Sequence, residues 1–186
     1  MEYRIRPVRA DEWEKCRELR LVALQDPVAP IAFLESYEKA LGEPDAFWQG
    51  RAAGATGDGA VLQLVAEEPD GGWAGTVTVL VERPGDPGPF GGEPEAPQTH
   101  LVGVFVRERA RGSGLAGALF RAAVDWSWAL GGETVRRVRL YVHEDNARAA
   151  AFYRRFGFAP SGATVPMPGD ETKLELEYEL PRPAGV

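Results

Sequence analysis

Alternating and helical patterns of apolar residues divide the first half of the chain into short elements. Residues 3–8 alternate as a half-buried strand does. Asp11 then begins a predicted helix, with Glu14 at capping-box distance and apolar positions at helical spacing as far as Pro27. Two short helices and a β-hairpin should follow. The helices are expected at residues 31–41 and 45–53, and the hairpin strands at 61–66 and 73–81.

Strands and helices alternate in the second half of the chain. The unit over residues 101–142 should be a right-handed crossover between parallel strands. A strand-rich first half followed by alternating elements predicts an α/β protein with helices on the faces of a mixed sheet. The expected strands are 101–106, 135–142 and 172–180, and the expected helices are 112–130 and 146–156.

Residues 83–98 have a different composition. Five prolines and four glycines fill nine of these sixteen positions. Such a segment buries too little apolar surface to offset the entropy lost on ordering. We predict a flexible insertion there, within a single domain that comprises residues 1–186.

Composition and charge exclude several classes of protein. The 28 acidic residues outnumber the 21 basic ones, so a protein that coats nucleic acid is not expected. Cys16 is the single cysteine and there are two histidines, which rules out an intramolecular disulfide and a Cys/His zinc cluster; no metal is expected. No apolar run reaches the ~18 residues of a membrane span, and the start lacks the core of a signal peptide. A cytoplasmic protein without membrane partners is expected.

Residues 102–120 carry the strongest chemical signal. A strand leads through a turn rich in arginine and glycine into a helix. Glycines allow a ligand to approach the backbone, and the first amides of a helix point outward with the positive end of its dipole, so a phosphate is the expected occupant. Residues 103–160 contain ten arginines and five acids, a local charge of +5 against −12 elsewhere. This asymmetry favours a polyanionic ligand, the alternative being an ion-paired surface.

Other phosphate-binding motifs fit less well. No Lys-Ser or Lys-Thr completes a Walker loop. Residues 112–117 read G-x-G-x-x-G, as in dinucleotide-binding folds, but the nearest candidate for the ribose-binding acid, Glu144, lies later than the expected ~20 residues. The 44 residues after Val142 are also too few to complete a doubly wound sheet.

Two separated motifs together resemble the GNAT superfamily of acyl-CoA-dependent N-acetyltransferases. The first is the run Arg111–Ala116, five residues past Val106, and the second runs from Asn146 through Tyr153 to Gly157-Phe158. The resemblance covers residues 101–160. It implies an α/β fold with a mixed, mainly antiparallel central sheet of about six to seven strands flanked by helices, and acetyl-CoA as cosubstrate.

The resemblance also implies roles for individual residues. Amides of the Arg111–Ala116 loop would hold the pyrophosphate, and the edge of the strand at residues 104–106 would pair with pantetheine and stabilise the oxyanion. Asn146 would both cap a helix and contact the cofactor, and Tyr153 would act as general acid toward the CoA thiolate. The residues expected to bind the cofactor are Val104, Phe105, Val106, Arg111, Gly112, Ser113, Gly114, Leu115, Ala116 and Asn146.

The acceptor amine must also lose a proton, since an alkyl amine has a pKa near ~10.4. Glu82 and His100 are the candidate bases, although the sequence favours a surface position for each, and residues 101–106 contain no carboxylate. Cys16 occupies a helical core position, so no acetyl-cysteine intermediate is expected.

The acceptor site is expected over residues 31–53 and the loops near 162–170. An aromatic row at helical spacing there indicates core packing, with an acceptor pocket as the alternative, and Glu35 or Glu38 would attract a cationic amine. The row consists of Phe33, Tyr37, Phe47 and Trp48.

We therefore expect an N-acetyltransferase in which a primary amine attacks acetyl-CoA directly in a ternary complex. The acceptor would be a small molecule or a peptide or protein amine, and the enzyme a monomer or homodimer. The alternative is a non-catalytic regulatory module that binds CoA or a dinucleotide.

Overall fold

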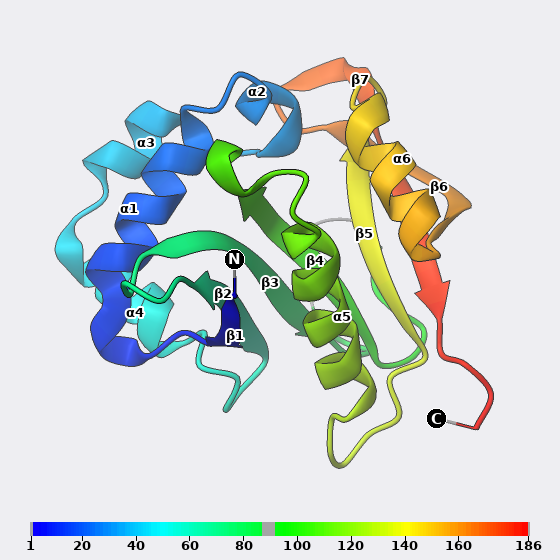
Figure 1. Ribbon diagram of the computed structural model, residues 1–186. Coiled ribbons are helices and arrows are strands. Elements are labelled where there is room, and N and C mark those ends of the chain that lie inside the picture. The colour runs from blue at the N-terminus through cyan, green and yellow to red at the C-terminus, as the bar shows by residue number, and fades with distance from the viewer. Residues whose placement is uncertain (1, 87–91, 186) are drawn as a thin grey trace. The chain divides into compact units, whose positions relative to one another are not determined.

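A computed structural model describes residues 2–86 and 92–185 (Figure 1). The chain divides into two compact units, one formed by Met1–Leu80 with Gly103–Ala123 and the other by Val81–Val102 with Val124–Val186. Seven strands form one mixed, mostly antiparallel sheet in the described part of the chain, accompanied by six α-helices. The predicted α/β fold class is confirmed.

The first unit contains the predicted hairpin. Strands β1 (Arg4–Pro7), β2 (Val61–Glu67) and β3 (Trp73–Glu82, which ends in the second unit) lie in that order and pair antiparallel. The connection between β2 and β3 needs a left-handed residue, and Gly71 supplies it with φ +85°.

Helix α1 (Trp13–Leu24) begins later than the sequence predicts. A 3₁₀ turn over Ala10–Glu12 precedes it, and the carboxylate of Glu12, not Glu14, accepts a hydrogen bond from the Arg9 amide at 2.9 Å. The predicted helical spacing does place Cys16, Leu19 and Ala23 on a buried face.

The single helix expected over residues 31–41 is wrong. Two short helices, α2 (Ala29–Ala32) and α3 (Tyr37–Gly42), occupy this region, because Ser36 caps α3 by accepting from the Lys39 amide at 3.2 Å. Helix α4 has the predicted bounds Asp45–Ala53 and lies beside α1 (Figure 1).

The second unit holds the start of β4 (Gln98–Val106), then β5 (Arg137–His143), β7 (Asp170–Pro181) and β6 (Ala159–Met167) in that order. The predicted parallel pair is confirmed, with Thr99 opposite Val138 in the β4–β5 register. β4 begins three residues before the predicted residue 101, because its first residues are polar but buried.

Strand β6 was not predicted, and the loops expected near residues 162–170 are largely this strand. It pairs antiparallel with β7 through two register shifts and is mostly exposed. Pro160, Gly162 and Pro166 obscure its pattern, and prolines are tolerated there because β6 is at the edge of the sheet.

Two further helices complete the fold. Helix α5 (Leu115–Trp128) begins three residues after the predicted Gly112, and α6 (Ala147–Phe156) begins at its Asn146 cap as predicted. No helix among residues 2–86 and 92–185 combines the length and apolarity needed to cross a membrane.

The proline-rich segment lies partly outside the described residues. Positions 87–91 are not described, and the flexibility expected for residues 83–98 stays a prediction. On either side of this gap, the Gly85 amide donates to the Glu93 carboxylate at 2.6 Å, and Pro94 is buried.

Candidate functional site

The glycine-rich turn before α5 presents main-chain amides without acceptors. Gly112 and Gly114 adopt φ angles of +80° and +84°. These left-handed conformations form the turn that connects β4 to the helix. Within the described residues, the amides of Gly112, Gly114, Leu115 and Ala116 donate to no other residue. A Cβ atom added at either glycine would meet nothing within 4 Å. Open space therefore adjoins a set of donors at the positive end of a helix, which suits an anion.

Arg111 holds this turn in place. Its Nε donates to the Val106 carbonyl at 3.0 Å, its Nη2 forms an ion pair with Asp26, and its own amide donates to the Glu108 carbonyl at 3.1 Å. The Ser113 amide also has an acceptor, the Ala110 carbonyl at 3.4 Å. Within the predicted loop, the amides that remain available to a ligand are therefore those of Gly112, Gly114, Leu115 and Ala116.

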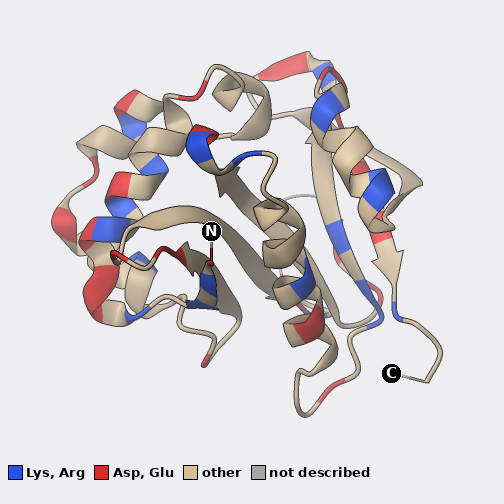
Figure 2. Cartoon of the chain, in the orientation of Figure 1, with Lys and Arg blue, Asp and Glu red and all other residues tan. Residues whose placement is uncertain are grey.

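The arginines near this turn are largely ion-paired. Arg107 pairs with Glu18, and Arg109 pairs with Glu68. Figure 2 shows acidic and basic positions interspersed along α1 and the adjacent short helices. The arginines directly before the turn are thus paired with acids from distant parts of the chain, so the amides, more than these arginines, indicate the anion site.

In the second unit, Glu82 and His100 are brought together in a buried cluster. The surface position expected for each is wrong, since both are 3% exposed. His100 Nδ1 lies 3.0 Å from Glu82 Oε1, and Gln98 Nε2 donates to Glu82 Oε2 at 2.7 Å. Arg139 donates to both carboxylate oxygens, at 2.8 and 3.0 Å.

These contacts give Glu82 and His100 different chemical capacities. Burial acts to raise the pKa of Glu82, but hydrogen bonds from His100 and Arg139 outweigh it and lower this pKa to about 2. Such a carboxylate is a weak proton acceptor. Because the ionised carboxylate accepts from His100, Nδ1 of that ring acts as the donor, and Nε2 is the ring atom that accepts a proton when the ring is neutral. The arrangement favours His100 over Glu82 as a base.

Glu82→Gln should lower the free energy of unfolding by about 3 kcal/mol at neutral pH, because it leaves buried Arg139 partly unpaired. Because folding lowers the pKa of Glu82, its ionised carboxylate stabilises the fold at pH values above its ordinary pKa of 4.5. This stabilisation is lost as the pH falls toward about 2. The difference in free energy of unfolding between the wild type and the variant should therefore become smaller below about pH 4.5. Urea unfolding at pH 7, 5, 4 and 3 measures it, with exposed Glu18→Gln as control. A difference that stays constant with pH would contradict this role.

Sequence reasoning missed the partners of this cluster on β5 and β7. Arg139 Nη1 donates to Glu177 at 3.0 Å, as does the Tyr141 hydroxyl at 3.1 Å, and Arg137 bridges Glu177 and Glu179 at 2.9 and 2.6 Å. The available signal was alternation, since arginines alternate along one strand and glutamates along the other.

Glu175, on the same strand, was also missed. It is 7% exposed, and burial raises its pKa to about 7. Among the residues described, its carboxyl group forms no hydrogen bond or ion pair. A carboxyl group in this state exchanges protons at neutral pH.

Helix α6 positions Asn146 and Tyr153. Asn146 Oδ1 accepts from the Ala149 amide at 3.2 Å, which confirms the predicted cap. Tyr153 is half-buried and packs against Phe158 and Tyr178, with both ring centroids 6.3 Å away. Burial, and then the charge of Glu175, raise the pKa of Tyr153 to about 12, so its phenol stays protonated at neutral pH.

Three of the four aromatic residues in the row of the first unit belong to the core, as their spacing indicated, whereas Phe47 is exposed. Trp48 is fully buried against Leu24 and Ala40, and Phe33 and Tyr37 pack against this group. Cys16 is buried as well, and burial raises the pKa of its thiol to about 11. Such a thiol is a poor nucleophile near neutral pH.

The mixed sheet and its flanking helices define an α/β protein, with a glycine turn at the start of α5. A model of the Acetyltransferase (GNAT) family matches residues 13–158, and the chain belongs to this family. No curated protein gives a significant match.

Several solved structures share the fold. NAA60 from Arabidopsis thaliana in complex with acetyl-CoA is 18% identical, with a TM-score of 0.67 over 96% of this chain and 98% of that chain. A GCN5-related N-acetyltransferase from Kribbella flavida is 22% identical, with a TM-score of 0.67 over 97% and 98%. A chimera of spermidine N-acetyltransferase SpeG from Vibrio cholerae and hSSAT is 14% identical, with a TM-score of 0.66 over 97% and 96%. At these identities the likeness concerns the fold.

Proposed function

We propose that the protein transfers the acetyl group of acetyl-CoA to a primary amine by direct attack in a ternary complex. The observation that carries this proposal is the set of unpaired amides at Gly112 and Gly114–Ala116, in a chain of the acetyltransferase family. These donors suit a diphosphate, and acetyl-CoA contains one.

The remaining predicted contacts concern the acyl arm. The backbone of Val104, Phe105 and Val106 would pair with pantetheine as an added strand, and an amide of this segment would donate to the thioester oxygen. Asn146 would add a contact to the cosubstrate. The roles of residues 104–106 belong to their backbone, so the apolar side chains are compatible with them.

The reaction requires two proton movements. The amine nitrogen attacks the carbonyl carbon, the new C–N bond forms, and the C–S bond breaks to release a thiolate. His100, oriented by Glu82, takes the proton that the amine loses. Tyr153 is kept protonated by its raised pKa and acts as general acid: it donates a hydrogen bond and then its proton to the departing thiolate. The phenolate then recovers a proton from solvent, to which His100 releases the proton that it took from the amine.

A thiol-release assay with acetyl-CoA and a panel of amines tests the proposal. We expect release of CoA that depends on the amine and an acetylated product of matching mass. A reaction that contains the protein and acetyl-CoA but no amine is the control for reaction of the thiol reagent with the protein itself. Tight binding of acetyl-CoA without release for any amine would favour a regulatory binding module, and thermal stabilisation by NADPH but not by CoA would favour a dinucleotide-binding protein.

A further inference from the structure

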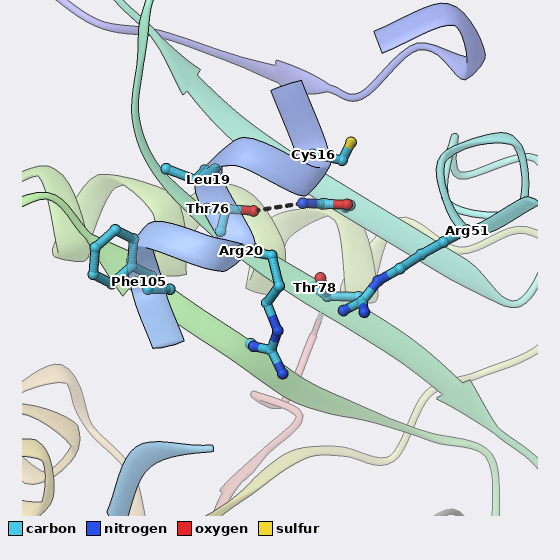
Figure 3. A pocket seen from close by; sticks show the side chains of 10 residues that line it. Cys16, Leu19, Arg20, Arg51, Thr76, Thr78 and Phe105 are labelled. Carbon is cyan, nitrogen blue, oxygen red and sulfur yellow. Dashed lines mark hydrogen bonds between the residues drawn. The ribbon is translucent and has the colours of Figure 1, made fainter. Parts of the chain in front are cut away.

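A pocket opens in the first unit between α1, α4 and the sheet (Figure 3). Its empty volume is about 380 Å³, including space open to solvent. Side chains from both helices and from β2, β3 and β4 contribute to its wall. The lining residues are Cys16, Leu19, Arg20, Ala23, Arg51, Gln63, Thr76, Thr78, Gly103 and Phe105.

The two charged residues that line this pocket are arginines. Arg20 Nε donates to Glu35 Oε2 at 2.9 Å, and Arg51 Nη1 lies 4.0 Å from the same oxygen. Neither arginine has another acidic partner among the described residues. Two guanidinium groups and one carboxylate leave one positive charge. The carboxylate of Glu35, which we expected from the sequence to attract a cationic amine, instead forms an ion pair with Arg20.

These guanidinium groups retain unused donors. In the part of the chain that the structure describes, the Nη atoms of Arg20 and all nitrogens of Arg51 donate no hydrogen bond to another residue. The side chains of Arg20 and Arg51 are 16% and 38% exposed. In Figure 3 the side chain of Arg51 extends toward Thr78, whereas that of Arg20 runs downward to the left of Thr78. Burial, and then the charge of Arg51, lower the pKa of Arg20. A bound anion would therefore stabilise the charged form of this guanidinium group.

We propose that Arg20 and Arg51 bind a carboxylate group of the acceptor, which is therefore an amine that also carries a carboxylate. A single carboxylate neutralises the charge of the pocket, whereas a phosphate dianion would leave it negative. Guanidinium groups hold carboxylates through paired, charge-assisted hydrogen bonds. Thr78 is half-buried, and its hydroxyl adds a further polar group.

The place of the pocket agrees with this assignment. Phe105 belongs both to its wall and to the stretch of β4 that the proposed function assigns to the acyl arm, and Gly103, which also lines the pocket, directly precedes that stretch. An acceptor anchored at the arginines would therefore lie beside that strand. This inference rests on the proposed acetyl transfer.

Matched acceptors test the inference. Amino acids, their carboxamides and spermidine are compared as acceptors by thiol release, in the wild type and in Arg51→Gln and Arg20→Lys variants. We expect kcat/KM to be at least about tenfold higher for the carboxylate than for its carboxamide, since a hydrogen bond to a charged group is lost. Arg51→Gln should raise KM for the carboxylate about tenfold and change KM for the carboxamide much less.

Arg17→Gln is the matched control, because Arg17 lies on α1 but does not line the pocket, and its ion pair with Asp45 spans 3.8 Å. Arg17→Gln should leave the ratio of kcat/KM between carboxylate and carboxamide unchanged. Equal use of carboxylate and carboxamide, or a preference for spermidine that Arg51→Gln does not alter, would overturn the inference and leave acetyl transfer intact. Absence of release with every amine would instead overturn the proposed function on which it rests.

Discussion

Gly114→Val is expected to weaken the binding of acetyl-CoA by at least about a hundredfold, because hydrogen bonds to a charged ligand contribute roughly 1.5–3 kcal/mol each. An added Cβ meets nothing within 4 Å, so it causes no clash in the unbound protein. The branched side chain would instead fill the space in front of the free amides. It would also disfavour φ +84°, which only glycine adopts readily.

Gly71→Val separates loss of the ligand from strain of the backbone. Gly71 has φ +85° with nothing within 4 Å of an added Cβ, and it lies in the turn between β2 and β3. Both variants should lose similar thermal stability, whereas calorimetry should show weakened acetyl-CoA binding for Gly114→Val alone. Equal affinities of the two variants for acetyl-CoA would argue against diphosphate binding by the amides at Gly112 and Gly114–Ala116.

Tyr153→Phe should lower turnover by about 10²- to 10⁴-fold, the usual contribution of a positioned acid. The ring contacts with Phe158 and Tyr178 survive this change, so the fold and the affinity for acetyl-CoA should not alter. Because the pKa of Tyr153 is raised to about 12, ionisation of this phenol should not limit activity below pH 10.

Tyr178→Phe is the matched control for this prediction. Tyr178 belongs to the same aromatic group, and its hydroxyl accepts from Arg154 Nη1 at 2.8 Å. Removing this hydroxyl should change turnover less than tenfold. Turnover of Tyr153→Phe within a few-fold of the wild type, with saturating acetyl-CoA, would exclude the proposed acid.

Local signals account for the elements that the sequence predicted well. Helix α4 begins after Pro44 and ends before Gly54, so both of its ends are marked in the sequence. The turn at Gly112 and Gly114 was recognisable because paired glycines directly before a helix favour a left-handed backbone that a ligand can approach. Strand β6 lacked such marks, since proline and glycine in an exposed edge strand resemble a loop.

Charged groups were harder to place because their partners are distant in sequence. Glu82 and His100 look like surface residues until Arg139 compensates their burial. Likewise, the arginines near residue 110 suggested a polyanionic ligand, but they form ion pairs with Glu18 and Glu68, which come from α1 and from the turn that follows β2. A single sequence does not reveal which strands become neighbours, so such pairs emerge only with the fold.

Amide resonances of Gly112, Gly114, Leu115 and Ala116 report most directly on diphosphate binding. In a ¹H–¹⁵N titration, acetyl-CoA should shift these signals, whereas S-acetylpantetheine, which has the same acyl arm without the diphosphate, should leave them in place. Signals that do not respond to saturating acetyl-CoA, or that respond equally to both ligands, would contradict an anion cradle at the start of α5.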